Sequence, residues 1–236
     1  MVGLAVLLCV AAAPARGGSP VWSRVQVAPD FWKTWGDGNA ELAAYDLTFP
    51  RYGEARRGTA VAIFIPEAFS RSLRVKADAG KHPDADLVPV MKLNLVQDFP
   101  TGIYDYNFMT TVFTTLAPGG GRPAGAPLKV TFSGQEWCGQ VFAQLLFDAD
   151  SIRSESRSYF DGEADQSGPL DYPAGGMSED ALLSWARGFT GPRLAPGERR
   201  DAPILDSLAS SRMRHRPLAW RKAALSRATA PARVTV

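Results

Sequence analysis

The sequence predicts a mainly β protein, with a strongly curved antiparallel sheet or incomplete β-barrel and one short helix near residues 178–188. Two observations lead to this fold class. Apolar and polar residues alternate along about seven runs between residues 43 and 160, which is the period of a half-buried strand. Short turns join most of these runs, which favours an up-and-down meander over alternating β and α units. We expect a single domain over residues 16–236.

The first half of the chain contains an aromatic cluster and four predicted strands. The four aromatic side chains are expected to pack against the open end of the sheet, because each buries on the order of 150–250 Å². They are Trp22, Phe31, Trp32 and Trp35. The strands are expected over residues 43–49, 59–65, 88–96 and 103–116, the first two forming a hairpin across residues 50–58.

Residues 127–160 contain the clearest strand patterns. In the first strand, Val130 and Phe132 alternate with polar residues. The second strand, 141–147, is partly apolar on its other face as well, which predicts a central position in the sheet. The third, 151–159, alternates serines with charged residues, a pattern typical of a solvated face or a polar concavity.

The remaining residues follow a different pattern. Residues 161–177 are polar and rich in Pro and Gly, and we expect a long loop that covers or binds something. Ser178 is a candidate N-cap for the short helix, which Gly188 ends. Residues 191–204 are expected as another loop, and the tail after Met213 as one or two strands. The strand-like ending predicts that the basic C-terminal segment, 193–236, is truncated.

The N-terminus predicts export. An apolar run over residues 2–13 is followed by Ala13-Pro14-Ala15, a small-x-small site suited to signal peptidase. Residues 1–15 are therefore expected to be a signal peptide, and the protein to reach the periplasm or the outer membrane. Removal of Cys9 would leave Cys138 as the sole cysteine of the mature chain, so no intramolecular disulfide is expected.

The charge is unevenly distributed. The chain carries a net charge of +2, but from Arg193 onward ten Lys or Arg face three acidic residues, a net +7 that leaves −5 for the rest. Such asymmetry can indicate an anionic partner. An anionic membrane surface is one hypothesis, contacted through Arg212, Arg214 and Arg216. A solvated strand face is the alternative, and nucleic acid is not expected for an exported protein.

Catalytic chemistry has few candidates. The mature chain offers one cysteine and two histidines, His82 and His215, too few for a zinc site, and we expect no metal and no cofactor. The sharpest catalytic hypothesis is a thiol hydrolase with Cys138 as nucleophile, His215 or His82 as base and Gln135 as an oxyanion donor. A cysteine in a strand-like context is more often a small buried hydrophobic residue, and we expect this for Cys138.

Seven short motifs carry a resemblance to a known family. They are Trp35-Gly-Asp-Gly-Asn-Ala-Glu-Leu, Arg51-Tyr-Gly-Glu, Gly58-Thr-Ala-Val-Ala-Ile-Phe, Lys92-Leu-Asn, Thr101-Gly-Ile-Tyr, Gln135-Glu-Trp-Cys-Gly and Ser158-Tyr-Phe. Over most of the mature chain the sequence resembles an uncharacterised family of exported bacterial proteins, some of whose members are labelled "septum formation inhibitor Maf". The nucleotide pyrophosphatases of that name carry an N-terminal Ser-x-Ser-Pro-Arg-Arg motif. This sequence lacks the motif, so the resemblance does not imply that activity.

A curved sheet closed by a helix suggests a function. Its concave face is a usual place to hold an apolar ligand, and we expect a non-enzymatic bacterial envelope protein that binds a lipid or another apolar molecule there. The candidate ligand-binding residues are Trp137, Phe142, Gln144, Tyr159 and Trp185. The alternatives are the secreted thiol hydrolase and a structural or assembly partner at the outer membrane.

The export hypothesis predicts where the mature chain begins. N-terminal sequencing of protein from the envelope fraction should begin at Arg16, because cleavage is expected after Ala15. Recovery of the protein from the cytosol with Met1 in place would contradict export.

Overall fold

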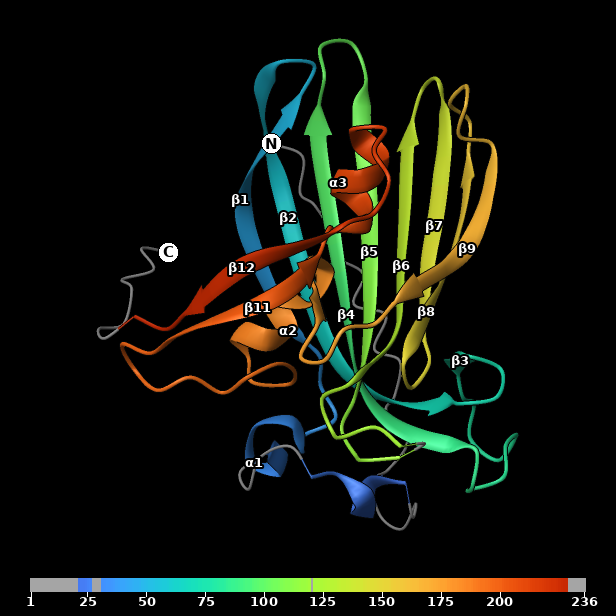
Figure 1. Ribbon diagram of the computed structural model, residues 1–236, viewed down its shortest axis with the longest axis vertical. Helices are drawn as coiled ribbons and strands as arrows, with labels where there is room; N and C mark the ends of the chain where they lie inside the picture. Colours follow the sequence, from blue (N-terminus) through green and yellow to red (C-terminus); the bar gives the residue numbers. More distant parts are fainter. Residues whose placement is uncertain (1–20, 27–30, 120, 229–236) are drawn as a thin grey trace, which may run out of the picture.

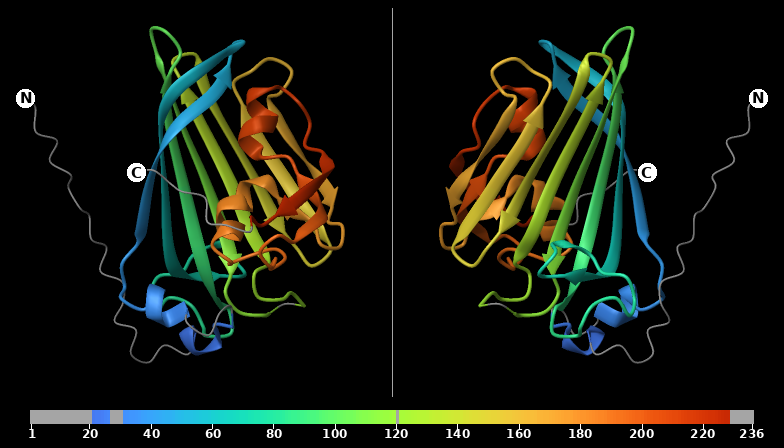
Figure 2. Two further views of the ribbon diagram at one scale, coloured as in Figure 1. Left: turned by 90° about the vertical axis from the view of Figure 1, so that its left-hand side faces the viewer. Right: turned by 90° about the vertical axis from the view of Figure 1, so that its right-hand side faces the viewer.

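The computed structural model describes residues 21–26, 31–119 and 121–228. The expected signal peptide and the end of the chain lie outside these residues. Within them no helix is long and apolar enough to span a bilayer. A large antiparallel sheet forms one layer, and a small sheet with short helices lies against its concave face (Figures 1 and 2).

The large sheet is a meander of nine strands and confirms the predicted fold class. Neighbouring strands follow one another in sequence, in the order β1-β2-β4-β5-β6-β7-β8-β9, while β3 pairs with β2 at one side. The sheet curls strongly but does not close into a barrel (Figure 2). The strands are β1 (Glu41–Arg51), β2 (Glu54–Ser70), β3 (Val75–Lys76), β4 (Leu87–Pro100), β5 (Asp105–Thr115), β6 (Pro127–Glu136), β7 (Gly139–Phe147), β8 (Ser151–Ser158) and β9 (Asp165–Asp171).

The small layer is built from the C-terminal third of the chain. Its sheet contains β10 (Met177–Ser178), β11 (Arg199–Leu205) and β12 (Trp220–Ser226), with β10 parallel and β12 antiparallel to the central β11. Its helices are η2 (Glu179–Ala181), α2 (Leu182–Ala186) and α3 (Leu208–Met213). Helix α3 packs on β5, β6 and β7. Two further short helices, η1 (Trp22–Arg24) and α1 (Phe31–Trp35), precede the large sheet.

The core lies between the two layers. Alternate residues of the large sheet turn inward, and they form one buried cluster with the small layer. Members of this cluster include Phe64, Leu93, Phe132 and Leu145 from the large sheet and Leu205, Leu208 and Met213 from the small layer. The centre of the concave face is therefore filled by side chains of the chain itself.

The aromatic cluster lies at one end of the sheet. Phe31 and Trp35 are buried, and the Trp35 ring lies 5.3 Å from the ring of Phe189. Trp32 is partly exposed and makes an edge contact with Trp22 at a centroid distance of 6.0 Å. Helix α1 thus contributes two of these four aromatic side chains to the core.

The turns divide the large sheet into two distinct ends. The β1–β2, β4–β5, β6–β7 and β8–β9 turns lie at one end, called here the turn end (top of Figure 1). The β2–β4, β5–β6 and β7–β8 connections and α1 lie at the other, called here the loop end. The β1–β2 turn contains only Tyr52 and Gly53, so most of the connection expected over residues 50–58 belongs to the strands.

The short helix was predicted correctly, and two predicted loops were not. Elements η2 and α2 occupy residues 179–186, and the Ser178 side chain accepts a hydrogen bond from the Asp180 backbone as the expected cap. The supposed loop over 161–177 contains β9, and the one over 191–204 contains most of β11. Both strands contain a proline and little alternation, and their pairing partners determine their conformation.

Gly58 offers a test of how closely β2 and β4 approach. A Cβ atom added at this position would lie 2.0 Å from the backbone oxygen of Asp98. Gly58→Ala should lower the free energy of unfolding by about 1–3 kcal/mol, because backbone must move to relieve the clash. Gly168→Ala in β9 is a matched control, since no atom lies within 4 Å of its added Cβ. Urea unfolding of both variants measures the difference, and equal stabilities would contradict the close approach.

Candidate functional site

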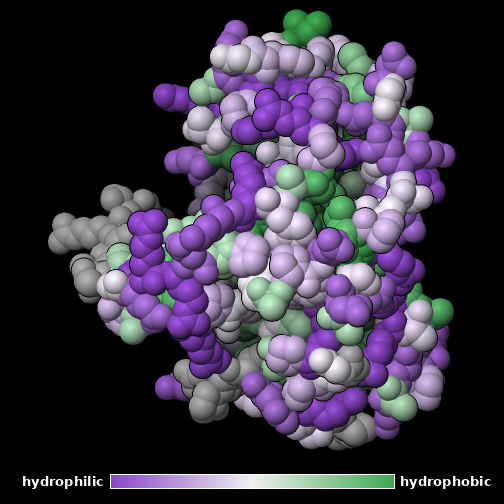
Figure 3. Space-filling model, in the orientation of Figure 1, coloured by the Kyte–Doolittle hydropathy of each residue, from purple (hydrophilic) through white to green (hydrophobic). Residues whose placement is uncertain are grey.

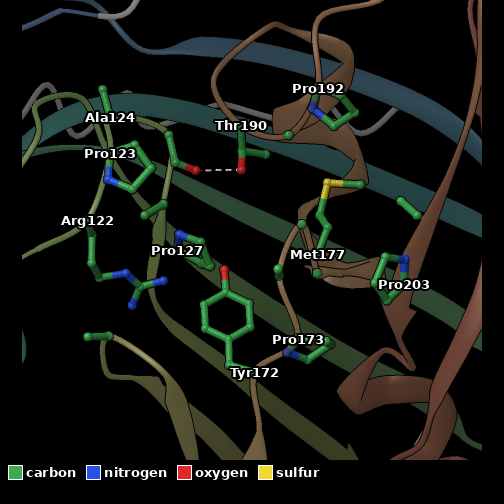
Figure 4. Close-up of a pocket in the computed structure, with 18 of the residues that line it drawn as sticks. Arg122, Pro123, Ala124, Pro127, Tyr172, Pro173, Met177, Thr190, Pro192 and Pro203 are labelled. Atoms are coloured by element: carbon green, nitrogen blue, oxygen red, sulfur yellow. Dashed lines mark hydrogen bonds between the residues drawn. The ribbon is translucent and has the colours of Figure 1, made fainter.

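A cavity of about 510 Å³ lies at the loop end, where the β5–β6 connection meets the small layer (Figure 4). Its walls come from the β5–β6 connection, the link from β9 to β10, the segment after α2, and part of β11. The volume falls within the range of small-molecule sites, about 300–1,000 Å³. Most of the lining is Pro, Ala and Gly, and the larger side chains are Arg122, Tyr172, Met177, Thr190, Arg200 and Asp201.

The local sequence explains why the β5–β6 connection forms a wall. Gly125 has a φ of +87°, and a Cβ atom there would lie 2.9 Å from the Phe189 backbone oxygen. Only glycine therefore lets this connection approach the segment after α2 so closely. Thr190 Oγ1 donates a hydrogen bond of 2.6 Å to the Gly125 carbonyl and joins the two segments (Figure 4).

Arg122 is the buried charge of the pocket. Its side chain extends toward Tyr172 (Figure 4), and the residue is only 9% exposed. The guanidinium carbon lies 5.2 Å from the centre of the Tyr172 ring and 6.0 Å from that of Phe147. Nη1 donates a 2.8 Å hydrogen bond to the Asp148 backbone carbonyl. Burial lowers the pKa of Arg122.

Arg122 forms no ion pair within the described residues. Of the described carboxylates, that of Asp148 is the one whose charge influences the pKa of Arg122, and it raises that pKa less than the neighbouring Tyr172 does. That carboxylate forms salt bridges with Arg74 and Arg153, and Arg122 contacts only the Asp148 backbone. A buried cation is normally paired with an anion, because desolvation of an unpaired charge is costly. The pocket therefore presents a cationic group that an acidic ligand would stabilise.

Tyr172 supplies a second polar group. Its ring makes an edge contact with Phe147 and stacks on Trp220, at centroid distances of 5.5 and 6.3 Å. The hydroxyl points into the cavity (Figure 4). Burial raises the pKa of Tyr172, so the hydroxyl stays protonated and can donate a hydrogen bond at neutral pH.

The arrangement fits a ligand with an acidic group and an apolar body. Arg122 and Tyr172 provide donors at one side of the cavity, while prolines and Met177 form apolar walls (Figure 4). A carboxylate has the acceptor geometry that a guanidinium group binds through two parallel hydrogen bonds.

None of the five predicted ligand-binding residues lines this cavity. Trp137 and Tyr159 lie in turns at the turn end, while Phe142 and Gln144 lie on the outer face of β7. Gln144 Nε2 donates a hydrogen bond of 2.8 Å to Glu155. Trp185 lies in α2, and its Nε1 donates to the carbonyl of Pro192, a residue that does line the cavity. Trp185 is thus the nearest of the five to the pocket wall.

The catalytic candidates do not come together. Cys138 is exposed in the two-residue β6–β7 turn, so the prediction of a buried strand residue was wrong. Glu136 pairs directly with Gly139, which leaves Trp137 and Cys138 outside the ladder. Within the described residues, no hydrogen bond links Cys138 to a histidine or to Gln135.

Each histidine has an acidic neighbour instead. His215 Nδ1 lies 2.7 Å from Glu163 Oε1, and the ring makes an edge contact with Phe160. His82 Nδ1 lies 3.6 Å from Asp86 Oδ2. Among the residues that the structure describes, no group of three or more His, Cys, Asp or Glu side chains is arranged to hold a metal ion.

The three arginines expected at a membrane surface differ in exposure. Arg212 is buried in α3, where Nη1 donates to Ser156 Oγ and Gln166 Oε1 at 3.3 and 3.2 Å. Arg212 therefore cannot contact a membrane surface without leaving the core. Arg214 and Arg216 are exposed.

Comparison of the chain with models of known protein families, with characterised proteins and with solved structures gives no match. Sequence reasoning missed Arg122 because it lies in a Gly- and Pro-rich connection, whose composition indicates a link between strands and not a binding site. The signal in the sequence is that Arg122 is the one charged residue of this connection, and its Gly, Pro and Ala neighbours have no acidic side chain to pair with it.

The exposed turn position of Cys138 predicts rapid labelling. In the folded protein, a maleimide should react with Cys138 at a rate close to that in the denatured chain, because the side chain is accessible. Cys138→Ser should change the free energy of unfolding by no more than about 0.5 kcal/mol, as expected for a surface substitution. Slow labelling that accelerates on denaturation would contradict this position for the thiol.

Proposed function

We propose that the protein is a non-enzymatic binding protein of the bacterial envelope that holds a small amphipathic acid in the Arg122–Tyr172 pocket. The observation that carries this proposal is the buried guanidinium of Arg122, which has no carboxylate partner within the described residues and borders an apolar cavity. The envelope location rests on the signal-like N-terminus and the resemblance to exported proteins.

A carboxylate on an acyl chain or a similar apolar body is the ligand class that the pocket favours. The acid would receive charge-assisted hydrogen bonds from Arg122, and the Tyr172 hydroxyl is positioned to donate another. Prolines, alanines and Met177 would contact the apolar part. Because the centre of the concave face is filled by the core, the ligand would occupy this end of the concavity and not its middle.

A binding role agrees better with the lining than hydrolysis does. The described residues of the cavity include no cysteine or histidine, and the Thr190 hydroxyl already donates to Gly125. Asp201, at the β11 wall, forms a salt bridge of 2.8 Å with Lys222. The lining thus offers no activated nucleophile beside a free base.

A matched pair of ligands tests the proposal. Decanoate should bind at least tenfold more tightly than decanol, because only the carboxylate pairs with Arg122. In Arg122→Gln this preference should disappear, while Arg122→Lys should retain part of it. Titration calorimetry gives the affinities, and native mass spectrometry gives the stoichiometry.

Arg153→Gln provides the control variant. Arg153 also contacts Asp148 but is exposed on the outer side, so its loss should leave decanoate binding unchanged. Binding of decanol by Arg122→Gln would show that the pocket remains folded. Equal affinity for decanoate and decanol in the natural protein, or an unchanged preference in Arg122→Gln, would refute the proposal.

A further inference from the structure

Each of the four turns at the turn end carries one exposed large apolar or aromatic side chain. Together these four residues are called here the tip residues. Their exposed fractions are 56% for Tyr52, 82% for Ile103, 72% for Trp137 and 64% for Tyr159. The four turns project in the same direction (Figure 1), and hydrophobic atoms form the uppermost point of the molecule, at the tip of the β4–β5 hairpin (Figure 3).

Trp137 and Tyr52 are held by an aromatic column that rises from the core. The Trp137 ring stacks on Tyr104 at 5.5 Å, and Tyr104 lies 6.1 Å from the fully buried ring of Tyr106. Tyr106 stacks on Phe99 at 5.3 Å, and its hydroxyl lies 2.7 Å from that of Tyr52. These two tip residues are therefore exposed but anchored, which lowers the entropy lost when a partner binds.

The other two tips are also fixed in place. The Tyr159 ring lies directly over Gly139, where an added Cβ atom would come within 2.2 Å of the ring. Ile103 lies in a turn closed by a hydrogen bond of 2.9 Å from the Thr101 backbone to the Tyr104 carbonyl. Gly102, with a φ of +100°, makes this turn possible. Ile103 is the most exposed of the four and has no polar group, so water is an unfavourable environment for it.

Basic residues border the tips. Arg51 Nη1 donates a hydrogen bond of 2.7 Å to the Met213 carbonyl, which holds the end of α3 at the turn end. The exposed Arg214 and Arg216 follow directly, beside the β8–β9 turn that Glu163 joins to His215. Exposed carboxylates lie at this end as well: Asp161 in the β8–β9 turn, and Glu54, Asp105 and Asp165 at the first residues of β2, β5 and β9. Positive and negative charges thus occur together at this end, so net charge alone would not attract a partner there. The exposed apolar tip residues are the main candidate contacts, and Arg214 and Arg216 are available to anionic groups.

We infer that the tip residues insert into the interfacial layer of a phospholipid bilayer, with Arg214 and Arg216 attracted to the headgroups of anionic lipids. Four separate points on four turns do not form the continuous face of about 800 Å² that a stable protein partner requires. A fluid bilayer accommodates separate protrusions. Tyr and Trp, with an apolar ring and one polar atom, are the residues enriched at the membrane interface. This inference is independent of the proposed ligand pocket, which lies at the other end of the sheet.

Vesicle binding tests the inference. The full chain should co-sediment with vesicles of phosphatidylethanolamine and phosphatidylglycerol, and the double variant Ile103→Asp/Trp137→Asp should bind at least tenfold more weakly. Both side chains are mostly exposed, but the Trp137 ring stacks on Tyr104, so a far-ultraviolet circular dichroism spectrum equal to that of the natural protein is required of the variant. The control is Leu42→Asp/Leu73→Asp, because these residues are 65% and 63% exposed but lie away from the tips. Absence of binding by the natural protein, or equal loss in both double variants, would overturn the inference.

Two further measurements separate insertion from simple adsorption. A polarity-sensitive fluorophore on Cys138, beside Trp137, should shift to shorter wavelength on the vesicles. The same fluorophore on Leu73→Cys, in a chain with Cys138→Ser, should not shift. In both chains Cys9 is replaced by serine. Arg214→Gln and Arg216→Gln should each weaken binding about fivefold on anionic vesicles, and hardly at all on phosphatidylcholine. Equal fluorophore shifts at positions 138 and 73 would contradict insertion of the tip residues. The same conclusion would follow if the arginine variants lost binding and Ile103→Asp/Trp137→Asp did not.

Discussion

The inner face of the open sheet has to be covered, and most of the architecture follows from this requirement. The central strands turn rows of apolar side chains to one side, and a bare face of this size would associate with other chains. The C-terminal third of the chain covers it with α3 and a second sheet. The buried guanidinium of Arg51 then ties the last residue of β1 to the end of α3. The cavity beside Arg122 and Tyr172 lies where this cover ends.

The two ends of the sheet differ because their connections differ. At the turn end, connections of two to six residues keep each tip rigid and hold exposed side chains in a row. At the loop end, the β5–β6 connection over residues 116–126 is long and rich in Pro and Gly, and it meets the small layer at the cavity. Such a segment fills space poorly, because its side chains are small and its prolines have no N–H to donate to a ladder. The pocket forms at this end for that reason.

Local patterns predict the meander but not the elements that depend on distant partners. Strands β4 to β8 follow from alternation within each segment, and the cap at Ser178 follows from one turn of sequence. Strands β9 and β11 lack that alternation and exist through their pairing. The prediction that Cys138 is a buried strand residue was wrong because Cys138 lies between two strand patterns. Only the pairing of Glu136 with Gly139 shows that the residue belongs to a turn. The sequence shows Arg122 only as an arginine among Gly and Pro residues; its burial against Phe147 and Tyr172 arises only in the folded chain.

Three buried arginines help to distinguish structural charges from a binding group. Burial lowers the pKa of Arg51, but hydrogen bonds to Tyr106 and Tyr52 outweigh it and the net shift is upward. Arg212 donates to Ser156 and Gln166, and the Glu163 carboxylate lies 3.8 Å away. Hydrogen bonds to two tyrosine hydroxyls and the Met213 carbonyl therefore compensate Arg51, and the Glu163 carboxylate compensates Arg212, although Arg212 Nε has no hydrogen-bond partner among the described residues. Arg122 has two aromatic faces, one backbone carbonyl and the hydroxyl of Tyr172 as neutral partners, and burial lowers its pKa. An anion in the adjacent cavity would supply the compensation that the fold gives the other two, and this places the binding hypothesis at Arg122.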